Sequence, residues 1–119
     1  MDAKEAVAAL GALAQDTRLQ VFRMLVEQGP DGLPAGVIAE KAGVPPSSLT
    51  FHLQLLLRAG LVTQRRMSRH LIYAAVPATM DGLLAYLSET LSGEGLRPGQ
   101  GAAPSARKTR PDRSQAGKP

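Results

Sequence analysis

A break at residues 43–46 constrains the fold of this chain more than any other feature. Gly43 can adopt a positive φ angle without the steric cost of a Cβ atom, and the two prolines that follow preset the φ angle that starts a helix. The segments on either side, residues 34–42 and 46–58, carry apolar residues at helical spacing. The sequence therefore predicts two short helices joined by a tight turn.

Similar patterns extend to both sides of this pair of helices. The expected helices span residues 3–15, 18–28, 34–42, 46–58 and 79–91, and the expected strands span residues 61–66 and 70–76. In the second helix, Asp16 is the expected N-cap, and Leu19, Phe22 and Val26 form the expected buried stripe. The predicted fold class is mainly α with a small β-hairpin, a winged helix-turn-helix in the order α-α-α-α-β-β-α.

Composition divides the chain into two regions. Residues 1–92 are expected to form one winged helix-turn-helix domain for DNA binding and dimerisation. Residues 93–119 contain five glycines, four prolines and no aromatic residue, and they are predicted to be a disordered basic tail because they cannot bury enough apolar surface.

Charge is strongly segregated along the sequence. Residues 41–80 hold five basic residues and no acid, whereas residues 1–40 hold six acids against three bases. The net charge of +4 arises from the last 23 residues, which carry six bases and one acid. A basic middle between acidic flanks predicts one surface suited to a polyanion.

Several functional classes are disfavoured. The chain has no cysteine, which excludes disulfides, thiolate metal sites and cysteine nucleophiles. No segment approaches the length of an apolar membrane span, and the charged N-terminus does not resemble a signal peptide. The sequence offers no catalytic constellation, cofactor motif or metal-ligand cluster, so we expect a cytoplasmic protein that is not an enzyme and has no cofactor, metal site or membrane partner.

The helix expected over residues 46–58 has two distinct faces. Leu49, Leu53, Leu56 and Leu57 cluster on one side, which predicts a buried stripe. The opposite side and its edges carry the candidate DNA-contacting residues Ser47, Ser48, Thr50, Phe51, Gln54 and Arg58. Hydroxyls bind phosphates or base edges, a glutamine can read adenine, and an aromatic ring can contact a thymine methyl. The alternative for the serines is that they only cap the helix. Leu55 also falls near the outer face, and the sequence does not decide whether it packs under the hairpin.

The hairpin supplies the remaining candidate DNA contacts. Arg65, Arg66 and Arg69 lie in or beside its strands, where they can reach the phosphate backbone or the minor groove. The alternative is a solvated hairpin edge, but the absence of acids over forty residues favours DNA. His52 is expected to be a packed, hydrogen-bonded residue rather than a ligand, and His70 a residue of the hairpin or a phosphate contact.

The apolar surface of the first and last helices is larger than we expect so small a domain to cover. The candidate dimer-interface residues are Val7, Leu10, Leu83, Leu84, Leu87 and Leu91. They are expected to contact a second copy of the chain; the alternative is that the leucines of the last helix complete the core of one copy.

Three groups of residues resemble the ArsR/SmtB family of winged helix-turn-helix repressors. They are Thr50-Phe51-His52-Leu53, the helix exit at residues 58–62, and the return strand from Arg69 to Tyr73. Residues 13–33 are similar to the second helix and following loop of that family, and the whole resemblance covers about residues 5–92.

The resemblance implies a homodimer joined by its first and last helices, and an operator released by an inducer. The chain is similar to arsenical-operon regulators but has none of their cysteines, its last helix has no histidine, and Ser68 stands where the wing turn usually has glycine. Metal or metalloid sensing is therefore not implied.

Together these observations predict a dimeric repressor that binds a near-palindromic site in double-stranded DNA and is released by an unidentified effector. Two other interpretations remain open. One is a constitutive or architectural DNA-binding protein without an inducer, and the other is a protein-interaction module on a winged-helix scaffold.

Overall fold

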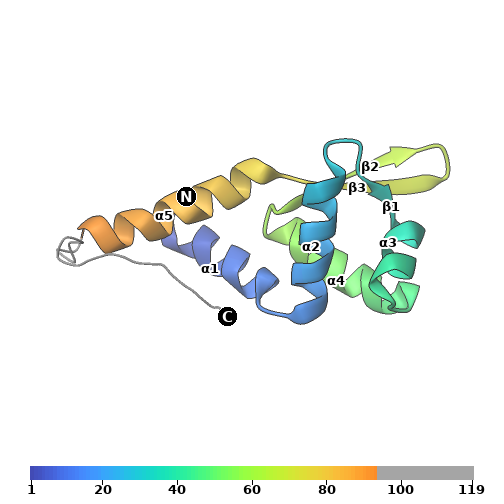
Figure 1. Ribbon diagram of the computed structural model, residues 1–119, viewed down its shortest axis with the longest axis horizontal. Coiled ribbons are helices and arrows are strands. Elements are labelled where there is room, and N and C mark those ends of the chain that lie inside the picture. The colour runs from blue at the N-terminus through green and yellow to red at the C-terminus, as the bar shows by residue number, and fades with distance from the viewer. Residues whose placement is uncertain (94–119) are drawn as a thin grey trace. The chain divides into compact units, whose positions relative to one another are not determined.

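The computed structural model describes residues 1–93 of the chain, in two units. Met1–Leu83 form the first unit, and the second begins at Leu84, within the last helix. The helices are α1 (Ala3–Leu13), α2 (Asp16–Gln28), α3 (Ala35–Ala42), α4 (Pro46–Arg58) and α5 (Pro77–Gly93), and the strands are β1 (Leu33–Pro34), β2 (Val62–Met67) and β3 (His70–Ala75). The predicted order of helices and hairpin is confirmed, with one short strand added (Figure 1).

Local chemistry explains where the first helices begin. Asp2 and Glu5 form a reciprocal capping box, in which each carboxylate accepts a hydrogen bond from the other residue's backbone N–H. At α2 the cap is Gln15, whose side-chain oxygen accepts from the Arg18 N–H, so the expectation that Asp16 caps this helix was wrong by one residue. Asp16 instead occupies the first turn, where a carboxylate favours the positive end of the helix dipole.

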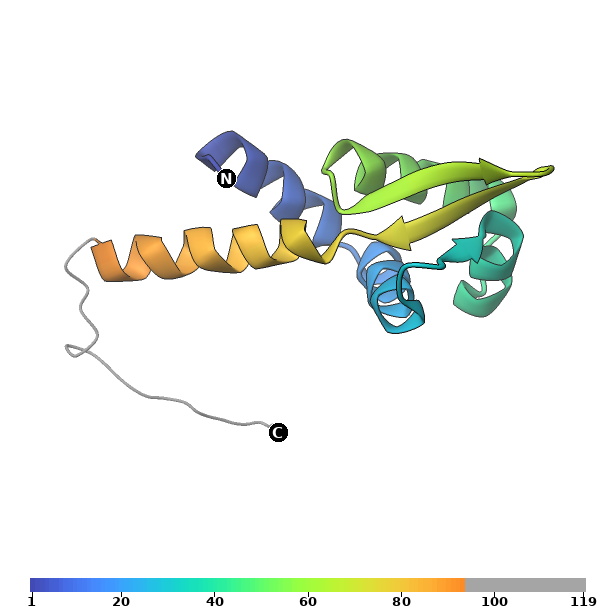
Figure 2. The ribbon, with the colours of Figure 1, turned by 90° about the horizontal axis from the view of Figure 1, so that it is seen from above.

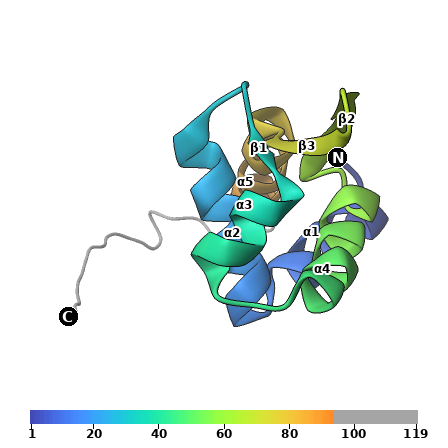
Figure 3. The same ribbon diagram turned by 90° about the vertical axis from the view of Figure 1, so that its right-hand side faces the viewer.

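The sheet has three antiparallel strands in the order β1-β3-β2. The strand β1 pairs Leu33 with Tyr73 and was not expected from sequence, because two residues are too few for a periodic pattern. In Figures 1 and 3 the strands lie on one side of α2, α3 and α4. The pairing of β1 with β3 attaches the end of the α2–β1 loop to the hairpin.

Aliphatic side chains from α2, α3, α4 and the start of the hairpin make most of the core of the first unit. The largest fully buried side chains are Val21, Leu25, Ile38, Leu49, Leu53, Leu56 and Leu61. In α1 the buried residues are alanines at positions 6, 9 and 12, which allow close packing of helices. The predicted stripe of α2 was largely wrong, since Leu19 and Val26 are exposed and only Phe22 is buried.

No helix within the described residues is long and apolar enough to cross a bilayer. The predicted basic tail lies, apart from Gly93, outside those residues. The expected domain boundary near residue 92 stays a prediction.

Candidate nucleic-acid interface

The pair α3–α4 has the helix-turn-helix geometry that the sequence indicates. Gly43 ends α3 with φ of 70°, and its N–H donates to the carbonyls of Ala39 and Glu40. The chain then runs extended through Pro45 into α4, whose first residue is Pro46. In the predicted leucine stripe of α4, Leu49, Leu53 and Leu56 are buried and Leu57 is only half-buried. The three buried leucines fix the rotation of this helix about its axis.

All six candidate residues of α4 are exposed: Ser47, Ser48, Thr50, Phe51, Gln54 and Arg58. Phe51 has 61% of its surface exposed, although its ring lies edge-on to the ring of His52, with the ring centroids 5.7 Å apart. The Thr50 hydroxyl donates to the Pro46 carbonyl at 3.0 Å, so its oxygen is left free to accept a further bond. The outer face of α4 thus presents hydroxyls, one amide, one aromatic ring and one guanidinium to an outside partner.

The hairpin projects beside this helix. Its turn and the first residues of α4 lie toward the same end of the first unit (Figures 1 and 2). The turn consists of Ser68 and Arg69, between the paired residues Met67 and His70, and Ser68 has a positive φ of 60°. Ser68 therefore adopts the conformation that glycine usually takes at the first central position of a type II′ turn.

The three arginines of the hairpin do not form one row. Arg65 and Arg66 are neighbours in β2, so their side chains point to opposite faces of the ribbon. Arg65 donates from Nη2 to the backbone carbonyl of Asp31 at 2.9 Å, across the sheet. Arg65 is therefore held against the α2–β1 loop, whereas Arg66 and Arg69 are exposed and have no hydrogen bond or ion pair among the described residues.

A histidine and an arginine connect three helices behind the exposed face. Arg18 of α2 donates from Nε to the Ala12 carbonyl at the end of α1, at 2.6 Å, and from Nη1 to Nδ1 of His52 in α4, at 3.2 Å. Arginine has no acceptor, so Nδ1 accepts and the neutral ring carries its proton on Nε2. This confirms the expectation of a packed, hydrogen-bonded His52, whereas the role of Arg18 carried no local signal in the sequence.

The pKa of His52 is lowered from its ordinary value of 6.5, first by burial and then by the positive charge of Arg18. A lowered pKa in the folded state means that its stabilising contribution is fully present above pH 6.5 and is lost as the pH falls through the lowered value.

We therefore expect acidification from about pH 7.5 to about pH 5.5 to lower the free energy of unfolding. In a His52→Asn variant the amide oxygen can replace Nδ1 as acceptor and does not titrate, so this part of the pH dependence should disappear. Urea denaturation at several pH values measures the free energy of unfolding of the unaltered protein and of the variant. Identical pH profiles for the two proteins would show that His52 is not the responsible group.

The candidate dimer residues divide into two groups. Val7 and Leu10 on α1, and Leu84, Leu87 and Leu91 on α5, are exposed large apolar residues. Leu83 is only 3% exposed in a single chain, so its assignment to the interface was wrong. It belongs to the core of the first unit, since a side chain already covered has no surface to offer a partner.

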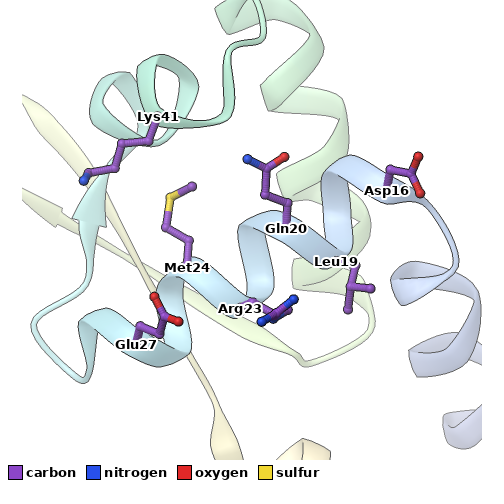
Figure 4. Close-up of a pocket in the computed structure, with 7 residues that line it drawn as sticks. All are labelled: Asp16, Leu19, Gln20, Arg23, Met24, Glu27 and Lys41. Carbon is purple, nitrogen blue, oxygen red and sulfur yellow. The ribbon is translucent and has the colours of Figure 1, made fainter. Parts of the chain in front are cut away.

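The described residues also form a hollow of about 560 Å³ along α2 (Figure 4). Six lining residues come from α2 and one, Lys41, from α3. The lining mixes Asp16 and Glu27 with Arg23 and Lys41, so its charges are balanced. Within residues 1–93 no three histidine, aspartate or glutamate side chains are grouped to hold a metal ion.

A family model described as a helix-turn-helix domain matches residues 13–65, the part of the chain that holds α2, α3 and α4. No curated protein sequence matches the chain.

Solved structures extend the match beyond this segment. NolR from Sinorhizobium fredii is 31% identical, over 74% of this chain and 85% of that chain, with a TM-score of 0.59. The transcriptional regulator HlyU from Vibrio vulnificus CMCP6 is 31% identical, over 71% of this chain and 86% of that chain, with a TM-score of 0.55.

An ArsR-like transcriptional regulator from Rhodococcus sp. RHA1 has a TM-score of 0.70 over 79% of this chain and 86% of that chain, and its 23% identity shows a shared fold. These matches confirm the resemblance carried by the α4 and hairpin motifs. The chain belongs to the ArsR family of winged helix-turn-helix transcriptional regulators.

Proposed function

We propose that this protein is a homodimeric repressor that binds a near-palindromic operator in double-stranded DNA and leaves it when an effector binds. The observation that carries the proposal is the outer face of α4. This face is exposed and largely polar, and it belongs to a stretch, residues 41–80, that contains no acidic residue. Contact with chromosomal DNA assigns the protein to the cytoplasm, and its role is binding rather than catalysis.

The two parts of the interface have different tasks in this proposal. Ser47, Ser48, Thr50, Phe51 and Gln54 enter the major groove, where Gln54 reads a base edge and the hydroxyls position the helix on phosphates. Arg58 at the end of α4, together with Arg66 and Arg69 of the hairpin, neutralises phosphates of the backbone. Arg65 mainly holds the hairpin against Asp31, because its guanidinium already has a backbone partner there.

Dimerisation follows from the exposed apolar residues of α1 and α5. Val7, Leu10, Leu84, Leu87 and Leu91 all lose contact with water if a second copy covers them. Two-fold symmetry would place two copies of α4 about one helical turn of DNA apart, which matches a near-palindromic site. The effector is not a thiophilic metal in this proposal, because the chain has no cysteine.

Replacing both Arg66 and Arg69 with alanine is expected to lower operator affinity per protomer by about 30-fold at 0.15 M salt. The dimer loses four phosphate contacts, and each removes about 0.9 from the slope of log affinity against log salt concentration, so the slope should become shallower by about 3.6. Fluorescence anisotropy measures both quantities with a duplex obtained by selection from random DNA.

The matched control is Arg23→Ala, which removes an exposed arginine from α2, outside the proposed interface. Its affinity and salt slope should equal those of the unaltered protein. Unchanged binding by the double variant would contradict the proposal and favour the protein-interaction module. Binding that no candidate effector alters would favour a constitutive DNA-binding protein.

A further inference from the structure

A narrow groove runs between α1 and α4, the two helices to which the proposed function gives dimerisation and DNA contact. Its volume is about 260 Å³, and its lining includes Ala8 and Gly11 of α1, Leu55 and Arg58 of α4, the C-cap residue Ala59, and Val7, which the proposed function also places at the dimer interface. All of these residues belong to the first unit. We call this hollow the α1–α4 groove.

Gly11 keeps the floor of the α1–α4 groove open. A glycine inside a helix is unfavourable, and here an added Cβ atom would meet no other atom within 4 Å. Packing within the described residues therefore does not require this glycine. Its effect is to leave space over α1 that a larger side chain would fill.

Leu55 forms part of the opposite wall. The spacing of α4 puts this leucine near the outer face, and the sequence does not decide what covers it. In the structure Leu55 is half-buried and lines the groove beside α1. An apolar side chain is thus held at a concave surface rather than inside the core.

One charge lies in this apolar lining, the guanidinium of Arg58, and no acidic residue lines the groove. Along the sequence, no acidic residue lies between Glu40 and Asp81. An apolar hollow with a single cation at its edge suits a molecule with an apolar body and one anionic group. The larger hollow along α2 lacks this preference, since it contains two acids and two bases and no residue of α4.

We propose that the α1–α4 groove binds a small amphipathic anion, an aliphatic or aromatic carboxylate, as the effector of this regulator. The apolar body lies over Gly11 against Leu55, and the carboxylate pairs with Arg58. Its regulatory consequence rests on the proposed function, because Arg58 is also an exposed residue of the proposed DNA interface. The carboxylate and a DNA phosphate then compete for one guanidinium, so each weakens the binding of the other.

Octanoate is a suitable probe, and the full chain labelled with ¹⁵N is titrated with it in NMR experiments. We expect saturable shifts of the Ala8, Gly11 and Leu55 amide signals, with a dissociation constant of about 1 mM for so small a ligand. Octylammonium, which has the opposite charge, should give no saturable shifts at these positions. Saturating octanoate should lower operator affinity by about tenfold.

Three variants separate octanoate binding in the groove from general binding to the protein surface. Gly11→Leu fills the groove, should weaken octanoate binding by at least about tenfold and should remove the effect of octanoate on operator affinity. Gly11→Ala, the matched control, adds only one carbon atom and should weaken octanoate binding much less. Arg58→Met should remove the preference for octanoate over octanol.

Three results would overturn the groove assignment. The first is the absence of a saturable shift, and the second is a set of shifts that map to Gln20 and Met24 on α2. The third is a set of shifts at Gly11 and Leu55 that depend on the protein concentration and not on the octanoate concentration. The last result would mean that a second copy of the chain covers the groove. Because the titration needs no DNA, it can fail while operator binding is intact, and it can succeed even if the proposed repressor function fails.

Discussion

Replacing Leu84 and Leu87 with glutamate is expected to convert the proposed dimer into monomers and to lower operator affinity by at least about 1,000-fold. Both leucines are exposed on α5, at 56% and 38% of their surface. In a two-fold symmetric interface each substitution acts twice, so four leucines, each contributing about 2 kcal/mol when buried, are replaced by charges. Light scattering after size-exclusion chromatography measures the mass, and anisotropy measures the affinity.

An Ala85→Glu variant is the control for the added charge. Helical spacing places Ala85 on the side of α5 that already carries Glu89, away from the leucines. This variant should remain a dimer and bind the operator normally. If the double leucine variant also keeps the dimer mass, the exposed leucines of α5 do not form the interface, and another surface must explain any dimer.

Replacing Gly32 with alanine is expected to lower the free energy of unfolding by about 3 kcal/mol. Gly32 has φ of +71°, and an added Cβ atom would lie 2.3 Å from the Tyr73 carbonyl oxygen and 2.9 Å from its carbon. The positive φ angle costs about 1–2 kcal/mol for any other residue. The clash adds to this cost because backbone atoms of β3 must move away, which disturbs the pairing of β1 with β3. Urea denaturation measures the loss.

Two other glycines separate these contributions. Gly43 has a similar φ of +70° but no atom within 4 Å of an added Cβ, so Gly43→Ala should cost only about 1 kcal/mol. Gly11 has neither constraint, and Gly11→Ala should raise the free energy of unfolding by about 1 kcal/mol. Equal losses for the Gly32 and Gly43 variants would show that contact with Tyr73 is not what makes Gly32 necessary.

Helix α4 shows which features are accessible from sequence. Leu49, Leu53 and Leu56 recur at helical spacing, and all three are buried as expected. Ser47 and Gln54 face outward for the same geometrical reason. Their contact with DNA remains a prediction, because exposure shows only that they are available.

Helix α2 shows where the same method fails. Leu19 and Val26 fit a helical stripe, but Val21 and Leu25 are buried in their place. Both sets satisfy the period of the helix, and only the positions of the neighbouring elements choose between them. Leu83 was misassigned for a similar reason, since nothing in its own segment tells whether a leucine is covered by its own chain or by a second copy.

The order of the helices and the hairpin, the two faces of α4 and the acid-free stretch of residues 41–80 were all decided by the amino-acid sequence, because they depend on short-range spacing and residue type. Tertiary structure alone decided that Arg65 binds the Asp31 carbonyl and that Arg18 binds His52. Each of these pairs is separated by 34 positions in the chain. No local period encodes such a partner, since it is set by how distant elements pack together.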